Sequence, residues 1–436
     1  MTDTIFALSS GHGKAGVAVI RISGTGLREF FSKIIQSGDI IPRRAYLINL
    51  RDNGGGPIDQ CIAIYFQAPS SFTGEDVIEL HTHGSYAVIE KVYEFLRGQG
   101  FRLAEPGEFT RRAFQNNKMD LVAADGLAGL LSARTDKQRA AALKSMTGSD
   151  SAAYENWRAQ MIEIAAYAAA ILDYPKDELP ENIKDKLLAR ASALHTEISG
   201  AISRYAAARA VRSGFNIVLA GETNAGKSSL FNRLVGESRA IVSDIPGTTR
   251  DAISAELDID GYLVRLTDTA GLRETDDVIE KIGIEKTNAE IKNADLVIKV
   301  MDKRTKGQKD NTNNNEIIVY NKSDLSDTSA HLSICPFVLS VSALTGAGIP
   351  ELLELIKQKI HNALDGAESD INVNQRARAH LIAAAEELEM AGKQSANMDL
   401  FAEHIRIASD EIGQILGVIE ASEIADAVFG QLCLGK

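Results

Sequence analysis

The spacing of apolar residues changes along the chain and divides it into segments with different expected structure. In the first 118 residues, β-rich runs bounded by Gly, Pro and Asp predict strands at residues 17–22, 46–50, 61–66 and 77–81. Apolar residues three and four positions apart predict helices near residues 27–35 and 86–96. We therefore expect an α+β domain at residues 1–118.

A different pattern follows from Asp120 to Arg212. This segment is rich in alanine, and its apolar residues recur every three or four positions, which predicts long helices. Its only prolines, Pro175 and Pro180, predict a break between two of them. After Leu364 the pattern is helical again and contains no proline up to Lys436.

Between these helical segments, residues 214–364 alternate apolar runs with helical patterns, which is typical of a parallel sheet with crossover helices. The expected strands are residues 215–220, 263–268, 295–301, 317–320 and 337–341. We therefore predict a multidomain α/β protein, in which the α/β domain (214–364) is inserted between the two halves (119–213 and 365–436) of a helical domain.

Composition narrows the class of protein. The chain has 436 residues, of which 44% are hydrophobic and 24% charged, as in soluble globular proteins, and no apolar run is long enough to span a membrane. Three cysteines and the absence of a secretory leader predict a cytoplasmic protein. The net charge of -12 argues against binding nucleic acid mainly through its phosphates, since residues 365–436 alone carry 5 Lys+Arg against 13 Asp+Glu.

The segment GETNAGKSS at residues 221–229 has the composition of a phosphate-binding loop between a strand and a helix. Gly221 and Gly226 allow the backbone to wrap closely around phosphates. Lys227 places a cation on the β- and γ-phosphates, and the Ser228 hydroxyl suits Mg²⁺.

Two shorter segments complete the expected metal and γ-phosphate contacts. In DTAG, Asp268 suits Mg²⁺ through water and the Gly271 N–H suits the γ-phosphate. In DIPGTTRD, the Thr249 hydroxyl suits a second direct Mg²⁺ bond. A segment held only by metal and γ-phosphate is released on hydrolysis, which is how such proteins switch.

The base preference follows from NKSD at residues 321–324 and SAL at 342–344. The Asp324 carboxylate accepts two hydrogen bonds from guanine, a match that adenine does not offer, and an amide of SAL suits the guanine O6. We therefore expect a GTP hydrolase with nucleotide contacts from Asn224, Ala225, Gly226, Lys227, Ser228, Ser229, Ser243, Asp244, Ile245, Pro246, Gly247, Thr248, Thr249, Asp268, Thr269, Ala270, Gly271, Asn321, Lys322, Ser323, Asp324, Ser342, Ala343 and Leu344.

The residue after DTAG is Leu272, where a glutamine commonly orients the attacking water. Glu280 is a candidate for that role, although a carboxylate in a helical stretch is by default solvated. A K⁺ ion held by the Asn224 side chain and the carbonyls of Ser243, Ile245 and Thr248 is a candidate for the positive charge that an arginine finger supplies elsewhere.

The flanking segments carry long, specific stretches: RIS at 21–23, SFTGEDVIELHTHGS at 71–85, EPGEFTRRAFQNNKMDL at 105–121, and a terminal CLGK. With the interrupting GTPase domain and the leucine after DTAG, they resemble the MnmE (TrmE) family of tRNA-modification GTPases, within the TrmE-Era-EngA-like P-loop GTPase superfamily. The resemblance covers essentially the whole chain.

This resemblance implies a homodimer whose N-terminal domain binds a tetrahydrofolate derivative, 5-formyl- or 5,10-methylene-tetrahydrofolate. It implies joint work with the flavoprotein MnmG, in a heterotetramer, to add a carboxymethylaminomethyl or aminomethyl group at C5 of wobble uridine 34 of certain tRNAs. It also implies K⁺ stimulation through the four residues above, water positioning by Glu280 and a catalytic Cys433. The implied folate contacts are Arg21, Glu79, Lys118 and Lys436.

Each of these roles has a plainer alternative. Arg21 in an alternating strand is by default a solvated side chain, and Cys433 is by default an inert small hydrophobe. His81 and His83 share one strand face, which suits a metal pair, but we favour a structural role because no Cys or third His lies nearby in sequence. The alternative for the whole protein is a regulatory GTPase of ribosome assembly, which the acidic 365–436 segment disfavours.

Overall fold

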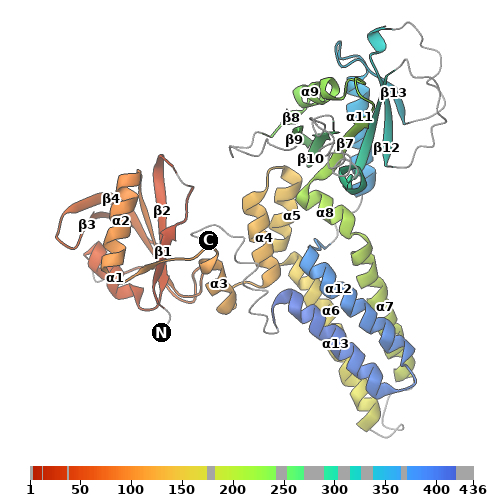
Figure 1. Ribbon diagram of the computed structural model, residues 1–436. Helices are drawn as coiled ribbons and strands as arrows, with labels where there is room; N and C mark the ends of the chain where they lie inside the picture. Colours follow the sequence, from red (N-terminus) through yellow and green to blue (C-terminus); the bar gives the residue numbers. More distant parts are fainter. Residues whose placement is uncertain are drawn as a thin grey trace, which may run out of the picture. The chain divides into compact units, whose positions relative to one another are not determined.

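The computed structural model describes residues 3–11, 13–36, 39–173, 182–241, 253–269, 289–302, 315–325, 337–364 and 371–418 (Figure 1). The chain forms two compact units. The first comprises residues 1–128, 145–191 and 386–436, and the second comprises residues 129–144 and 192–385.

The N-terminal part of the first unit is built on a six-stranded sheet of order β3-β4-β5-β2-β1-β6. Its strands are β1 (Ile5–Leu8), β2 (Ala15–Gly24), β3 (Ala45–Arg51), β4 (Pro57–Phe66), β5 (Asp76–Gly84) and β6 (Arg102–Leu103). Helices α1 (Leu27–Ile35) and α2 (Tyr86–Gly98) pack on it over a core that includes Ile20 and Ile22. Since side chains alternate along a strand, Arg21 lies on the opposite face. The four predicted strands and both predicted helices are confirmed.

The opposite face of this sheet carries a second, smaller core. Ile5 and Ala7 of β1 pack there with Ala104 and Phe109, while Phe6 and Leu8 enter the main core. Strand β1 is therefore buried on both faces. Phe109 belongs to helix α3 (Glu108–Gln115), which, like β1 and β6, the apolar pattern did not predict.

The helical segments expected on both sides of the α/β domain are present. They are α4 (Leu121–Ser132), α5 (Asp136–Met146), α6 (Ser149–Asp173), α7 (Ile183–Ser203), α8 (Tyr205–Ser213), α12 (Gln375–Lys393) and α13 (Met398–Leu416). Helix α13 packs along α6, so segments more than two hundred residues apart in sequence lie side by side (Figure 1). This pairing confirms that the α/β domain interrupts a helical one. No helix in the described ranges is both long and apolar enough to cross a membrane.

The inserted domain holds a seven-stranded sheet of order β13-β12-β11-β7-β10-β9-β8. Its strands are β7 (Phe215–Gly221), β8 (Arg239–Ala240), β9 (Ile253–Ile259), β10 (Tyr262–Asp268), β11 (Leu296–Asp302), β12 (Glu316–Asn321) and β13 (Val338–Ser340). The five predicted strands are confirmed and pair in parallel.

The sheet is mixed, because β9 and β8 add to the predicted parallel strands an antiparallel pair that was not predicted. The cause is a hairpin between β9 and β10. Ile259 pairs with Tyr262 across a two-residue loop, Asp260-Gly261, in which both residues have positive φ, 54° and 81°. Asp-Gly is a favoured sequence for such tight hairpin turns.

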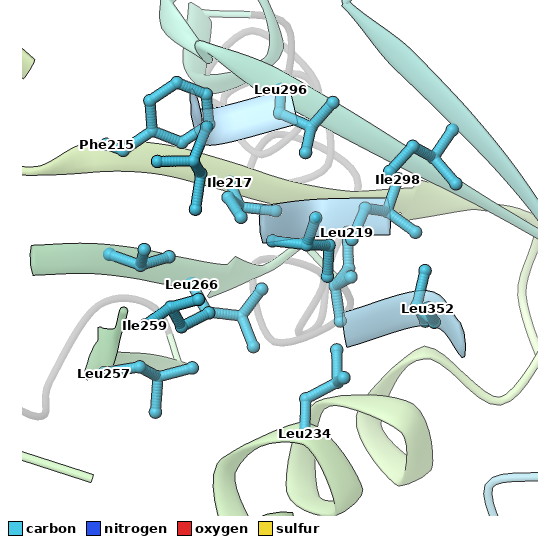
Figure 2. Packing of buried hydrophobic residues seen from close by; sticks show 14 of the residues in the cluster. Phe215, Ile217, Leu219, Leu234, Leu257, Ile259, Leu266, Leu296, Ile298 and Leu352 are labelled. Carbon is cyan, nitrogen blue, oxygen red and sulfur yellow. The ribbon is translucent and has the colours of Figure 1, made fainter. Parts of the chain in front are cut away.

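One face of this sheet is covered by α9 (Lys227–Glu237) and α11 (Ile349–Leu364) over a continuous apolar core. Figure 2 shows β7 contributing Phe215, Ile217 and Leu219 to this core, with Leu234 of α9 and Leu352 of α11. The core fixes the end of β7 against the start of α9. That junction is where the phosphate-binding loop lies.

The start of α5 packs on the β9–β10 hairpin, within the second unit. The Lys137 N–H donates to the Gly261 carbonyl at 3.3 Å, and its Nζ lies 5.3 Å from the centre of the Tyr262 ring. Arg134 forms an ion pair with Glu256 of β9. Gln138, which is buried, donates to the Arg212 carbonyl at 2.8 Å. A segment expected to be part of the helical domain is thus attached to the α/β sheet.

Candidate functional site

The loop between β7 and α9 requires glycine at two positions. Gly221 has φ of 148°, and a Cβ there would lie 2.0 Å from the Val300 carbonyl oxygen. Gly226 has φ of 87°, and a Cβ there would lie 2.3 Å from Asn321 Nδ2. Any larger residue at either position would displace a neighbouring strand or the Asn321 side chain. The loop is therefore held close to β11 and β12 in a glycine-dependent conformation, as is typical of loops that bind an anion through their backbone.

The cation and the metal ligands expected from the sequence lie at this loop. Lys227 is buried, and its Nζ donates to the carbonyls of Gly221 (3.1 Å) and Glu222 (2.9 Å). The Ser228 hydroxyl donates to Asp268 Oδ2 at 2.6 Å, and Asp268 is fully buried. A hydroxyl and a carboxylate at this separation are the oxygen ligands that Mg²⁺ prefers. These two residues therefore fit an Mg²⁺ site.

Asn321 joins the phosphate loop to the segment that was expected to meet the base. Its Nδ2 donates to the Ala225 carbonyl at 3.1 Å, and its Oδ1 accepts from the Ala343 N–H at 3.1 Å. Asn321 is only 2% exposed. The buried Asn321 side chain therefore holds the phosphate loop and the segment at Ala343 together. Lys322 crosses to the same loop, donating to the Asn224 carbonyl at 2.7 Å.

The Asp324 carboxylate stays at the surface and is oriented by Ser342, whose hydroxyl donates to Asp324 Oδ1 at 2.6 Å. Two of the three amides proposed for guanine O6 have protein partners, since the Ser342 N–H donates to the Ala347 carbonyl and the Ala343 N–H to Asn321. Leu344 is highly exposed. Of these three, its amide is the remaining candidate for the base.

Several predicted site residues lie outside the described ranges. For the nucleotide and metal sites these are Ser243, Asp244, Ile245, Pro246, Gly247, Thr248, Thr249, Ala270, Gly271 and Glu280. For the folate site and its chemistry they are Cys433 and Lys436.

Arg21 and Glu79 form a second polar site on the N-terminal sheet. They are directly paired across β2 and β5, and Arg21 Nε and Nη2 both donate to Glu79 Oε1 at 3.1 Å. The guanidinium lies 4.9 Å from the centre of the Phe72 ring and 5.7 Å from that of Phe109. Its side chain is 13% exposed, so the default expectation of a solvated strand residue was wrong.

Lys118 lies at the edge of the same region. Its Cγ is 3.2 Å from the position that a Cβ on Gly74 would occupy, two residues after Phe72 in sequence.

The two histidines of β5 differ from each other: His83 Nδ1 is 2.8 Å from Asp59 Oδ1, whereas His81 Nε2 is 3.5 Å from Glu79 Oε2. The described residues contain no cluster of three His, Cys, Asp or Glu suited to a metal ion.

A buried charged network, which sequence reasoning missed, fixes the segments that flank Arg21. Arg112 of α3 donates to Glu75 and to Glu108, each at 3.0 Å, and the Ser23 hydroxyl donates to Glu75 at 2.8 Å. Burial would raise the pKa of Glu108, but hydrogen bonds from Arg102 and Arg112 outweigh it, so this pKa is lowered. The EPGEF stretch was a signal for this network, because its Glu108 is the first residue of α3.

Two family models match the chain. The model of the GTP-binding protein TrmE N-terminus matches residues 4–118, and that of the MnmE helical domain matches residues 121–433. A tRNA modification GTPase MnmE from Rhizobium johnstonii is 37% identical over 443 residues, covering 100% of this chain and 99% of its own length. One from Brucella ovis is 40% identical over 440 residues, covering 100% of this chain and 98% of its own.

The G domain of the T. maritima FeoB iron transporter is 27% identical and covers 34% of this chain and 98% of its own. Its TM-score of 0.24 is too low to carry a structural argument.

Proposed function

The chain belongs to the MnmE family of tRNA modification GTPases, and we propose that it hydrolyses GTP in the cytoplasm to drive modification of wobble uridines in certain tRNAs. The main observation that supports this proposal is that the phosphate-binding loop, Asp268 and the segments at Asn321 and Ala343 lie together in the structure. Ser228 contacts Asp268 at 2.6 Å, and Asn321 joins the phosphate loop to Ala343. Residues from four separate segments thus converge where one nucleotide would lie.

The chain's own groups suit each part of GTP. The amides of the phosphate loop and Lys227 bind the β- and γ-phosphates, and Asp324 selects guanine through its two-acceptor carboxylate. Ser228 and Thr249 would hold Mg²⁺ directly and Asp268 through water; when bound, this ion neutralises charge on the β- and γ-phosphate oxygens. Asn321 holds the phosphate loop through the Ala225 carbonyl, and the Ser342 hydroxyl orients the Asp324 carboxylate. Because these contacts are present without nucleotide, the pocket is preorganised for binding.

We propose that hydrolysis uses K⁺ and Glu280 in place of an arginine finger and a glutamine. Asn224 supports the K⁺ site because its backbone is left-handed, with φ of 64°, and its side chain is exposed on the phosphate loop. The other ligands would be the carbonyls of Ser243, Ile245 and Thr248. GTP turnover should be faster in KCl than in NaCl at equal ionic strength, and Asn224→Ala should remove the difference. Equal rates in both salts would refute the K⁺ proposal.

For the chemistry on tRNA, we propose that the N-terminal domain, residues 1–118, binds a tetrahydrofolate derivative at Arg21, Glu79 and Lys118, with Lys436 and Cys433 from the chain terminus. The support is that Arg21 and Glu79 are paired and only partly exposed, and that Arg21 Nη1 is a buried atom without a hydrogen-bond partner in the described structure. The remaining domains would be the helical halves, 119–213 and 365–436, and the GTPase domain, 214–364.

We also propose a homodimer that works with MnmG. Leu47 of β3 and Ile62 of β4 are paired in register on the same sheet face as Glu79, and they are 73% and 40% exposed. Adjacent exposed apolar side chains beside a polar site suit an interface. Leu47→Glu should convert a dimer to a monomer in light scattering, whereas Asn49→Glu, two residues along the same edge strand, should not.

The decisive test of the overall function is mass analysis of wobble uridines from cells that lack the gene. We expect the carboxymethylaminomethyl and aminomethyl modifications to disappear and to return with the wild-type gene but not with Asp324→Ala. An unchanged modification in cells without a redundant enzyme would refute the proposal. Binding of 5-formyltetrahydrofolate by isothermal titration tests the folate site separately.

A further inference from the structure

The two residues that contact the Glu79 carboxylate each have a buried nitrogen atom without a hydrogen-bond partner in the described structure. Arg21 Nη1 is one, and His81 Nε2 is the other. A buried polar atom without a hydrogen-bond partner destabilises the fold, and two such atoms around one ion pair are unusual in a folded domain. Such atoms are retained where a ligand supplies the missing partners.

The geometry around the carboxylate is asymmetric. Arg21 uses Nε and Nη2 on Oε1, both at 3.1 Å, so the guanidinium lies on the Oε1 side and its Nη1 is directed away from Glu79. His81 Nε2 lies 3.5 Å from Oε2 without hydrogen-bond geometry, on the other side. Glu79 thus retains acceptor capacity on both oxygens, with a donor on one side and an imidazole nitrogen on the other.

We propose that His81 is a specificity-determining residue of this site, which accepts a hydrogen bond from the exocyclic amine of a 2-amino-4-oxo heterocycle bound by Glu79. This rests on the proposed folate function. A 2-amino-4-oxo ring offers a ring N–H and an amine hydrogen, which match the two oxygens of a carboxylate. Its oxo group then lies on the side of Arg21, and the second amine hydrogen lies on the side of His81 Nε2.

His81 and its neighbour His83 make a natural comparison. Both lie on β5, two positions apart, and therefore on one face. His83 is largely exposed and already engaged, since its N–H and its Nδ1 both contact the Asp59 carboxylate at 2.8 Å. His81 is 30% exposed, and its Nε2 is buried. Only His81 has a buried ring nitrogen available to a ligand at Glu79, and acceptance at that nitrogen requires a neutral ring protonated at Nδ1.

The experiment is isothermal titration of 5-formyltetrahydrofolate into the full chain and its variants. We expect His81→Leu, which keeps the volume but removes the nitrogen, to weaken affinity about tenfold, the effect of losing one hydrogen bond of roughly 1.4 kcal/mol. His81→Gln, which restores an acceptor, should recover affinity to within about threefold of wild type by the same reasoning. His83→Leu should bind as tightly as wild type.

The outcomes separate this inference from the function on which it rests. If wild type gives no binding, or Glu79→Gln binds as well as wild type, the folate site itself is wrong. If Glu79→Gln loses binding while His81→Leu matches wild type, the folate site stands and the role of His81 is refuted. If His81→Gln fails to recover affinity although its melting temperature equals that of wild type, a hydrogen-bonding role is likewise refuted.

Discussion

Replacing Asn321 with alanine tests how the nucleotide pocket is organised. In the wild-type protein this side chain is 2% exposed and joins two loops, through the Ala225 carbonyl and the Ala343 N–H, each at 3.1 Å. Alanine removes both hydrogen bonds. It also leaves the two backbone groups without the partner that satisfied them.

The size of the effect follows from these contacts. Each hydrogen bond contributes about 0.5–1.5 kcal/mol net, so their loss should cost about 2 kcal/mol in the free energy between the unfolded chain and the nucleotide-bound state. If the loops separate in the free protein, the cost falls on affinity, and 2 kcal/mol corresponds to a Kd about 30-fold weaker. If they stay together, it falls on stability. The loss in stability and the loss in binding free energy should therefore add up to about 2 kcal/mol, whichever of the two is larger.

Two measurements give that sum: urea unfolding of the nucleotide-free protein and titration with a fluorescent GDP analogue. Asn293→Ala is the matched control, because Asn293 is an exposed asparagine of the same unit, and its replacement should change either quantity by less than about 0.5 kcal/mol. A summed loss for Asn321→Ala no larger than that of the control would refute the reasoning.

Three further predictions concern other sites. Asp324→Asn should weaken GTP binding about 100-fold and favour xanthosine triphosphate, because its amide donates where the carboxylate accepted; unchanged base preference in competition titrations would contradict it. The lowered pKa of Glu108 means that its ionised form stabilises the folded state above its ordinary value of 4.5, and this contribution is lost as pH falls through the lower folded value. Glu108→Gln should therefore destabilise by about 2 kcal/mol at pH 7 and by progressively less below pH 4.5 in urea titrations, whereas a pH-independent difference would contradict it. Burial, reinforced by the charge of Asp59, raises the pKa of the Cys61 thiol to about 12, so a pulse of N-ethylmaleimide at pH 7.5 should leave Cys61 unlabelled in peptide maps until urea is added.

Much of the fold was predictable because its long elements have strong periodic patterns. The parallel strands β7, β10, β11 and β12 are rich in apolar residues, and each contributes side chains to the continuous core of the domain. Strand β9 was missed although its sequence, ISAELDI, alternates apolar and polar residues, which is the pattern of a half-buried strand. The Asp260-Gly261 dipeptide that forms its turn was a readable hairpin signal.

The candidate sites were predictable in a more limited way. The residues that would contact the phosphates and the base belong to short, specific sequence motifs. The contacts that position those residues are not marked by any such motif. The inward role of Asn321 depends on Ala225 and Ala343, which lie 96 and 22 residues away in sequence. The burial of Arg21 likewise depends on Phe72 and Phe109, from distant segments. Such contacts are set by tertiary packing and leave no local pattern.

The attachment of α5 to the β9–β10 hairpin has a mechanical consequence. Each residue of β9 from Ile253 to Ile259 is matched to one of β10, so β9 cannot slide without turning its buried side chains to the wrong face. The hairpin is therefore a stiff connection between the start of β9 at Ile253 and the start of α5. At its turn the Gly261 carbonyl lies 3.3 Å from the Lys137 nitrogen, so we expect the hairpin and the start of α5 to move together as one rigid piece.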